Sequence, residues 1–165
     1  MSHALQLAEK GLYTTTPNPR VGCVIVKGER IIASGWHEKA GLPHAEINAL
    51  NEAGEAARGA TVYITLEPCN HYGLTPPCAN ALIEAGVVKV VMAMEDPNPL
   101  VAGQGRRRLE QAGITVQSGL LETQARALNK GFISRMTRKR PWVRVKIAAS
   151  MDGKTALQNG ASQWV

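Results

Sequence analysis

The chain has 165 residues, of which 44% are hydrophobic and 19% charged, a composition that excludes intrinsic disorder. No apolar run reaches the roughly 18 residues of a membrane span and no signal-peptide pattern opens the chain, so we expect a cytoplasmic location. The net charge of +6 arises near the C-terminus, because residues 1–125 carry 10 basic and 12 acidic residues, whereas residues 126–146 carry 8 basic residues and no acidic one. The main body is therefore not expected to bind nucleic acid.

Short β-type runs alternate with helical stretches along the chain, and this alternation predicts an α/β layered fold. Ser2 is expected to cap a first helix that ends at Gly11. A hairpin then follows, and further helices and strands alternate after it. The predicted hairpin strands cover residues 21–27 and 31–36, the later strands 61–66, 87–94 and 114–117, and the later helices 44–58, 78–85, 106–112 and 122–136.

The C-terminal stretch differs from the rest of the chain. After the basic run RMTRKR, Pro141 opens a new β pattern, WVRVKIAAS, which leads into MDGKTALQNGASQWV. This piece is too short to fold alone. We expect it to be either a strand docked on the main sheet or the opening of a second domain.

Candidate metal ligands gather at two places. His44 and Glu46 lie where a loop enters a predicted helix, whereas Cys69 follows a predicted strand and Cys78 opens the next helix. One imidazole and two thiolates are three good zinc ligands, and three protein ligands leave a fourth position open, as in catalytic zinc sites. Glu46 is close to the metal without binding it and can act as the general acid and base. This pattern, His-x-Glu followed by Pro-Cys and a second Cys, is typical of zinc-dependent nucleobase deaminases.

Two other interpretations have to be weighed against a small-molecule deaminase. A tRNA or cytidine deaminase is disfavoured because eight residues separate Cys69 from Cys78, where most zinc deaminases have two. A structural zinc site or binding module would need a fourth ligand. Cys23 is the one remaining cysteine, and its place in a β run indicates a core residue. An assay for ammonia release together with the zinc content separates these interpretations.

Several longer segments resemble the RibD family of riboflavin-biosynthesis enzymes. They are TPNPRVGCVIV, GWHEKAGLPHAE, TLEPCNHYG, TPPC, EDPNPLVAGQG and LNKGF. The resemblance implies a three-layer αβα cytidine-deaminase-like fold with a central mixed sheet over residues 1–140. It also implies one Zn²⁺ per chain and hydrolytic deamination of a diaminopyrimidinone ribosylamino 5′-phosphate, a small-molecule substrate.

The resemblance also implies substrate-binding residues. These are Asn18, His37 and His71, with Ala45 contributing backbone beside the metal ligand. Considered alone, Asn18 can equally be a turn residue before a proline, and both histidines can be ordinary exposed side chains. The sequence departs from the family at Leu74, where a Lys or Arg that can pair with the substrate phosphate is common.

Residues 141–165 resemble the start of the family's reductase domain, which is built like dihydrofolate reductase. The resemblance places Lys146, Ala148, Ser162 and Trp164 at positions that line the reductase substrate and NADPH site. A nicotinamide site needs the rest of that domain, so we expect no reductase activity from these 165 residues. We further expect a homo-oligomer.

Overall fold

Five strands form one mixed sheet in the order β2-β1-β3-β4-β5 in a computed structural model that describes residues 1–72 and 76–162. Strand β1 is antiparallel to both β2 and β3, whereas β3, β4 and β5 are parallel to one another. The predicted hairpin and all three later strands are confirmed, with ends that differ by a few residues. The strands are β1 (Gly22–Lys27), β2 (Arg30–Trp36), β3 (Thr61–Ile64), β4 (Lys89–Met92) and β5 (Thr115–Ser118).

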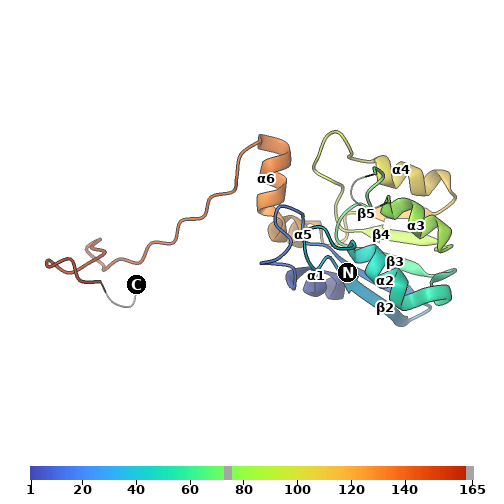
Figure 1. Ribbon diagram of the computed structural model, residues 1–165, viewed down its shortest axis with the longest axis horizontal. Helices are drawn as coiled ribbons and strands as arrows, with labels where there is room; N and C mark the ends of the chain where they lie inside the picture. Colours follow the sequence, from blue (N-terminus) through green and yellow to red (C-terminus); the bar gives the residue numbers. More distant parts are fainter. Residues whose placement is uncertain (73–75, 163–165) are drawn as a thin grey trace.

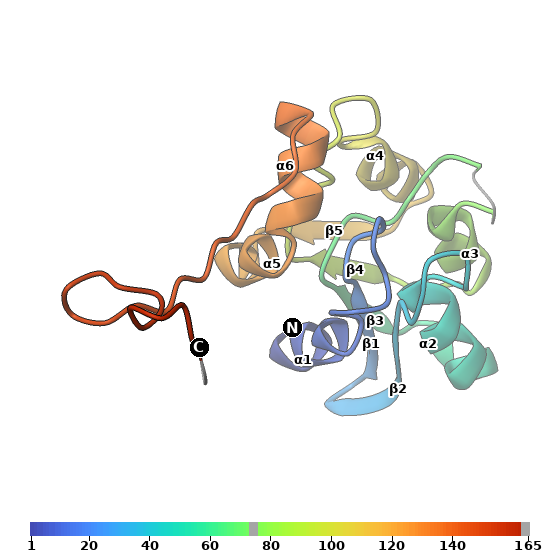
Figure 2. The same ribbon diagram turned by 60° about the vertical axis from the view of Figure 1, so that its left-hand side comes forward.

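Helices cover both faces of this sheet, so the predicted three-layer αβα architecture is confirmed (Figure 2). Helices α1 (Ser2–Glu9) and α5 (Glu122–Leu128) lie on one face. The other face carries α2 (Ala45–Ala53), with a 3-10 turn (Gly54–Ala57) at its end, followed by α3 (Cys78–Glu84) and α4 (Gln104–Gln111). Helix α6 (Lys130–Arg138) follows α5 closely and leads to the C-terminal stretch.

The core lies on both faces of the middle strands. Val90, Val91 and Met92 in β4 are all buried, as expected for a strand covered on both faces, and this burial explains its continuous apolar run. Helix α2 lies close against β2, because a Cβ atom on Gly35 would come within 2.6 Å of the Ala45 carbonyl oxygen. A glycine at this position therefore lets the start of α2, which carries the candidate ligand His44, approach the sheet.

Three helix predictions are wrong in detail. The helix predicted over residues 44–58 ends at Ala53, because Gly54, with a φ of 52° and a ψ of −138°, is not helical. Met1, not Ser2, precedes the first helix, and no side chain caps it. The single helix predicted over residues 122–136 is two helices, α5 and α6, separated at Asn129, whose φ of −110° and ψ of 23° are not helical. A tertiary contact of the Asn129 side chain, described below, accounts for this break.

Residues 141–162 contain no helix or strand and extend away from the body in both views (Figures 1 and 2). A strand docked on the main sheet is therefore wrong for the described residues. The opening of a second domain stays a prediction. No helix in the described parts of the chain is both long and apolar enough to cross a membrane.

Candidate active site

The candidate site lies at one edge of the sheet. Strands β3 and β4 are parallel, so their carboxyl ends meet at this edge, and Cys69 and Asp96 follow them there. The antiparallel strand β1 begins at the same edge and β2 ends there, which brings Asn18 and His37 alongside. The topology thus gathers residues that are far apart in the sequence.

Three potential metal ligands meet at this edge. His44 is the residue before α2, Cys78 opens α3, and Cys69 lies in the loop after β3. His44 Nδ1 is 3.2 Å from Cys78 Sγ and 3.6 Å from Cys69 Sγ, and all three ligand atoms lie within 4.8 Å of one another. Zinc bonds of ordinary length in a tetrahedron separate a nitrogen from a sulfur by about 3.6 Å. The group therefore fits zinc.

Hydrogen bonds within the group favour negative charge on Cys69. The Cys78 thiol, the His44 ring and the Cys78 backbone N–H, which is 3.3 Å from Cys69 Sγ, together lower the pKa of Cys69 to about 4. The pKa of Cys78 rises because its proton is shared with that neighbouring sulfur, and the hydrogen bond to Cys69 raises the pKa of His44. These contacts thus favour one thiolate, at Cys69, and a bound cation would favour the second.

Glu46 lies beside the three ligands without belonging to the group. It is in the first turn of α2 and only 4% exposed, and it shares a hydrogen bond with the Cys78 sulfur. Burial, followed by the negative charge of Cys69, raises the pKa of Glu46 to about 7. Its carboxyl group can therefore both hold and release a proton near neutral pH.

A cavity of about 240 Å³ opens onto this group. Six of the residues predicted from the sequence line it together, so the structure brings most of the predicted site into one place. They are Asn18, His37, His44, Glu46, Cys69 and His71. His71 is otherwise exposed, whereas His37 is only 3% exposed.

Asn18 and His37 hold each other in fixed orientations. His37 Nδ1 is 3.1 Å from the Pro43 carbonyl oxygen, which can only accept, so this nitrogen carries the ring proton. His37 Nε2 then accepts from Asn18 Nδ2 at 3.1 Å. Burial lowers the pKa of His37, in agreement with a neutral ring. Within residues 1–72 and 76–162 no hydrogen bond uses the Asn18 amide oxygen, so this oxygen can accept from a ligand.

The other predicted site residues that the structure describes do not line the cavity, and this holds for Cys78 too, although its sulfur belongs to the ligand group. Ala45 is fully buried in the core at the first position of α2, next to His44. Lys146, Ala148 and Ser162 lie in the C-terminal stretch, away from the cavity (Figure 1). Leu74 and Trp164 lie outside the described residues.

Nine of the fifteen residues that line the cavity were not predicted from the sequence. The polar residues among those missed follow β3 and β4, and their position after predicted strands was a usable signal. The apolar residues on α6 gave no such signal, because the sequence of a helix does not tell which part of the protein its apolar side chains will face. The missed residues are Pro19, Val21, Leu66, Glu67, Asp96, Asn98, Val101, Phe132 and Met136.

Asn129, at the break between α5 and α6, anchors the strand entry that carries Asn18. Its Oδ1 accepts from the Arg20 backbone N–H at 2.8 Å, and its Nδ2 donates to the Arg20 carbonyl at 2.9 Å. The side chain is 1% exposed. The Arg20 guanidinium also donates to the Leu128 carbonyl at 2.7 Å. Asn129 is the asparagine of the LNKGF segment, so these bonds give that segment a structural role: they fix the backbone beside Asn18.

Asn129→Ala is expected to lower the free energy of unfolding by about 1–3 kcal/mol, because the part-buried backbone N–H and C=O groups of Arg20 both lose their partner. Urea unfolding followed by circular dichroism measures the change. Asn51→Ala, at an exposed position of α2, is the matched control and should stay within about 0.5 kcal/mol of the parent. Equal stability of the two variants would contradict this anchoring role.

The fold and the site together are of the kind found in zinc-dependent nucleobase deaminases. The family described as the cytidine and deoxycytidylate deaminase zinc-binding region matches residues 1–94. The diaminohydroxyphosphoribosylamino-pyrimidine deaminase of Buchnera aphidicola is 55% identical over 136 residues, which are 82% of this chain and 92% of that protein. The chain therefore belongs to the cytidine and deoxycytidylate deaminase family and, within it, to the deaminase domains of the RibD type.

Full-length relatives agree with this family. The riboflavin biosynthesis protein RibD of Escherichia coli is 57% identical over 165 residues, which are 100% of this chain and 45% of that protein. The structure of Acinetobacter baumannii RibD superposes with a TM-score of 0.95 at 57% identity and covers 99% of this chain and 46% of that one. The chain thus spans less than half the length of these relatives.

Proposed function

We propose that this chain deaminates 2,5-diamino-6-ribosylamino-4(3H)-pyrimidinone 5′-phosphate to 5-amino-6-(5-phosphoribosylamino)uracil, with release of ammonia. The observation that carries the proposal is the buried carboxyl group of Glu46, which faces the same cavity as the His44, Cys69 and Cys78 group. The names of the Buchnera aphidicola and Escherichia coli relatives support the choice of substrate class and of the pathway, riboflavin biosynthesis.

The proposed mechanism assigns proton transfer to Glu46. When bound by the three ligands, zinc supplies the acidity that makes water nucleophilic at neutral pH. Glu46 takes one proton from the attacking water, donates it to the ring nitrogen, and then carries a second proton to the leaving amine. The water oxygen bonds to the ring carbon, the carbon–nitrogen bond breaks, and ammonia leaves. Because Glu46 is buried, the proton that it carries is shielded from bulk water during the reaction.

The cavity wall has the groups needed to read a pyrimidine edge. The free Asn18 amide oxygen accepts from a ring N–H or amine, and the buried pair it forms with His37 fixes its direction. His71, on the exposed side of the cavity, is available for a second polar contact. These roles for Asn18, His37 and His71 are part of the proposal.

A solely structural metal site is disfavoured by the donor set. Within residues 1–72 and 76–162, the group has three potential ligands, and Cys23 lies buried in β1 outside it. A closed zinc site would hold four protein ligands. The open fourth position is what a catalytic site requires.

Ammonia release from the zinc-loaded chain tests the proposed function. The diaminopyrimidinone ribotide should be deaminated with a kcat/KM at least about 10²-fold above that for cytidine or deoxycytidylate, since a site that pairs with a substrate's polar groups rejects analogues lacking them. Comparable rates with deoxycytidylate, or no ammonia from the ribotide, would refute the substrate assignment.

The substrate phosphate lacks an assigned partner, because the family's cation is replaced by Leu74. If the phosphate passes this position, Leu74→Arg adds a charge-assisted contact of about 1.5–3 kcal/mol at most, and KM should fall about tenfold. Measuring KM for the phosphorylated and dephosphorylated substrates in both proteins isolates the phosphate. An equal effect on both substrates, or on neither, would rule out the loop.

Several further expectations stay predictions. Residues 141–165 are proposed as the start of an NADPH-dependent reductase domain, with a boundary at residue 140. A homo-oligomer and a cytoplasmic location are likewise proposed, and light scattering of the purified chain tests the first of these.

A further inference from the structure

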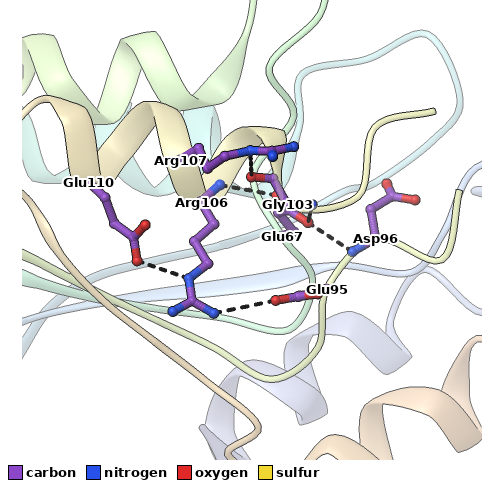
Figure 3. A network of polar contacts seen from close by, with 7 residues as sticks. All are labelled: Glu67, Glu95, Asp96, Gly103, Arg106, Arg107 and Glu110. Carbon is purple, nitrogen blue, oxygen red and sulfur yellow. Dashed lines mark hydrogen bonds and ion pairs between the residues drawn. The ribbon is translucent and has the colours of Figure 1, made fainter. Parts of the chain in front are cut away.

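Glu67 is a buried carboxylate that the deamination chemistry does not use. It follows β3, two residues before the ligand Cys69, and is only 5% exposed although it lines the cavity. Its side chain points to the start of α4 (Figure 3). A buried charge is costly unless polar groups compensate it, so its partners show what it does.

Three backbone N–H groups compensate the charge of Glu67. Oε2 accepts from Asp96 at 3.1 Å and from Gly103 at 2.9 Å, while Oε1 accepts from Arg106 at 3.0 Å. Two of these donors lie at the start of α4, one at its N-cap residue Gly103 and one in its first turn at Arg106, where the helix dipole also favours negative charge. The Arg106 guanidinium does not join them, since it pairs with Glu110 and Glu95 on the surface (Figure 3).

The three bonds close a loop. Asp96 and Gly103 both lie in the segment between β4 and α4, Asp96 four residues after β4 and Gly103 directly before α4, and Glu67 Oε2 accepts from both. Inside this segment, Asp96, Asn98 and Val101 line the cavity. One carboxylate thus fixes the segment that contributes these three residues to the cavity wall.

A second contact ties the same region to the metal ligands. A Cβ atom on Gly105 would lie 1.9 Å from the Pro68 carbonyl oxygen, so the start of α4 rests directly on the residue before Cys69. Only glycine allows this approach. The Glu67 carboxylate and the Gly105 contact together join α4, the cavity wall and the Cys69 loop into one unit.

We propose that Glu67 is a positioning residue for substrate binding, which orients Asp96 and Asn98 toward the ligand without touching the reacting atoms. This inference rests on the proposed function for its kinetic readout. Because Glu67 acts on the wall and not on Glu46, its loss weakens binding more than it slows chemistry. The Glu67 hydrogen bonds and the Gly105 contact form without substrate, so their loss in a variant can be measured independently of activity.

Glu67→Gln tests the proposal in the zinc-loaded full chain. The amide has one acceptor oxygen, so whichever way it turns, its NH₂ group faces at least one of the three N–H donors. We expect KM to rise about tenfold, as for the loss of one charge-assisted hydrogen bond. We expect kcat to change less than about threefold. The zinc content should stay at that of the parent.

Hydrogen exchange provides the readout that does not depend on catalysis. Backbone amides of residues 96–106 should exchange faster in Glu67→Gln, while those of β3 and β4 keep the parent rate. Glu110→Gln is the matched control, because it makes the same change on α4 but its partner is the exposed Arg106 guanidinium. This control should leave KM and exchange unchanged.

Two outcomes would overturn the proposal. The first is an unchanged KM with unchanged exchange in residues 96–106, and the second is a fall in kcat as large as that of Glu46→Gln with an unchanged KM. If Glu67→Gln does not fold, Glu67→Asp keeps the charge one methylene shorter, and both its KM and the exchange of residues 96–106 should rise relative to the parent. If the parent chain releases no ammonia, the proposed function is refuted. Faster exchange of residues 96–106 in Glu67→Gln than in that parent would still support the positioning role.

Discussion

Glu46→Gln is expected to reduce ammonia release by at least about 10²-fold, and up to about 10⁴-fold, while leaving the fold and the zinc content intact. Glutamine has nearly the shape of glutamate but cannot take a proton from the attacking water or return one to the leaving amine. Since burial raises the pKa of Glu46 to about 7, ionising it in the folded chain is unfavourable. Replacing it should therefore not lower the melting temperature.

Steady-state kinetics with the ribotide substrate, together with metal analysis, measure this effect. Glu52→Gln is the matched control on the same helix, because Glu52 is exposed and accepts a hydrogen bond from the Ser34 backbone N–H at 2.7 Å. The control should keep the parent rate. If Glu46→Gln released ammonia as fast as the parent, Glu46 would have only a structural role.

Cys78→Ser is expected to abolish stoichiometric zinc binding and, with it, deamination. The substitution replaces a thiolate by a hydroxyl group, which stays protonated at neutral pH and is a poor zinc ligand, so two good ligands remain. Loss of the Cys78 sulfur also removes the hydrogen bond that lowers the pKa of Cys69. Both effects weaken the site.

Metal analysis of chains purified with zinc in the buffer measures the occupancy. Cys23→Ala provides the control, because Cys23 is fully buried in β1 and does not belong to the ligand group. It should retain one zinc per chain. Full occupancy in Cys78→Ser would refute the assignment of this ligand.

The sequence was sufficient to predict the group of side chains that can hold a metal, and most of the sheet. His44, Cys69 and Cys78 were recognisable because each stands at a junction between predicted elements, where side chains gather at the edge of a sheet. The hairpin and the buried strand β4 were recognisable because alternation, turn residues and continuous apolar runs are local properties of the chain. Chemistry that depends on residue type and spacing can therefore be predicted from the amino-acid sequence.

Only the tertiary structure decided how the cavity wall is held. Asn129 interrupts a helix that local propensity favours, because its side chain pairs with the Arg20 backbone, which lies 109 positions earlier in the sequence. The sequence shows Glu67 two residues before Cys69, but it does not show the partners of Glu67. These are backbone N–H groups of a loop and a helix that follow a different strand. Hydrogen bonds to main-chain atoms leave no residue-type signal, because every residue except proline offers the same N–H group. The sequence therefore determined which groups we propose to perform the chemistry, and the fold determined which groups hold them in place.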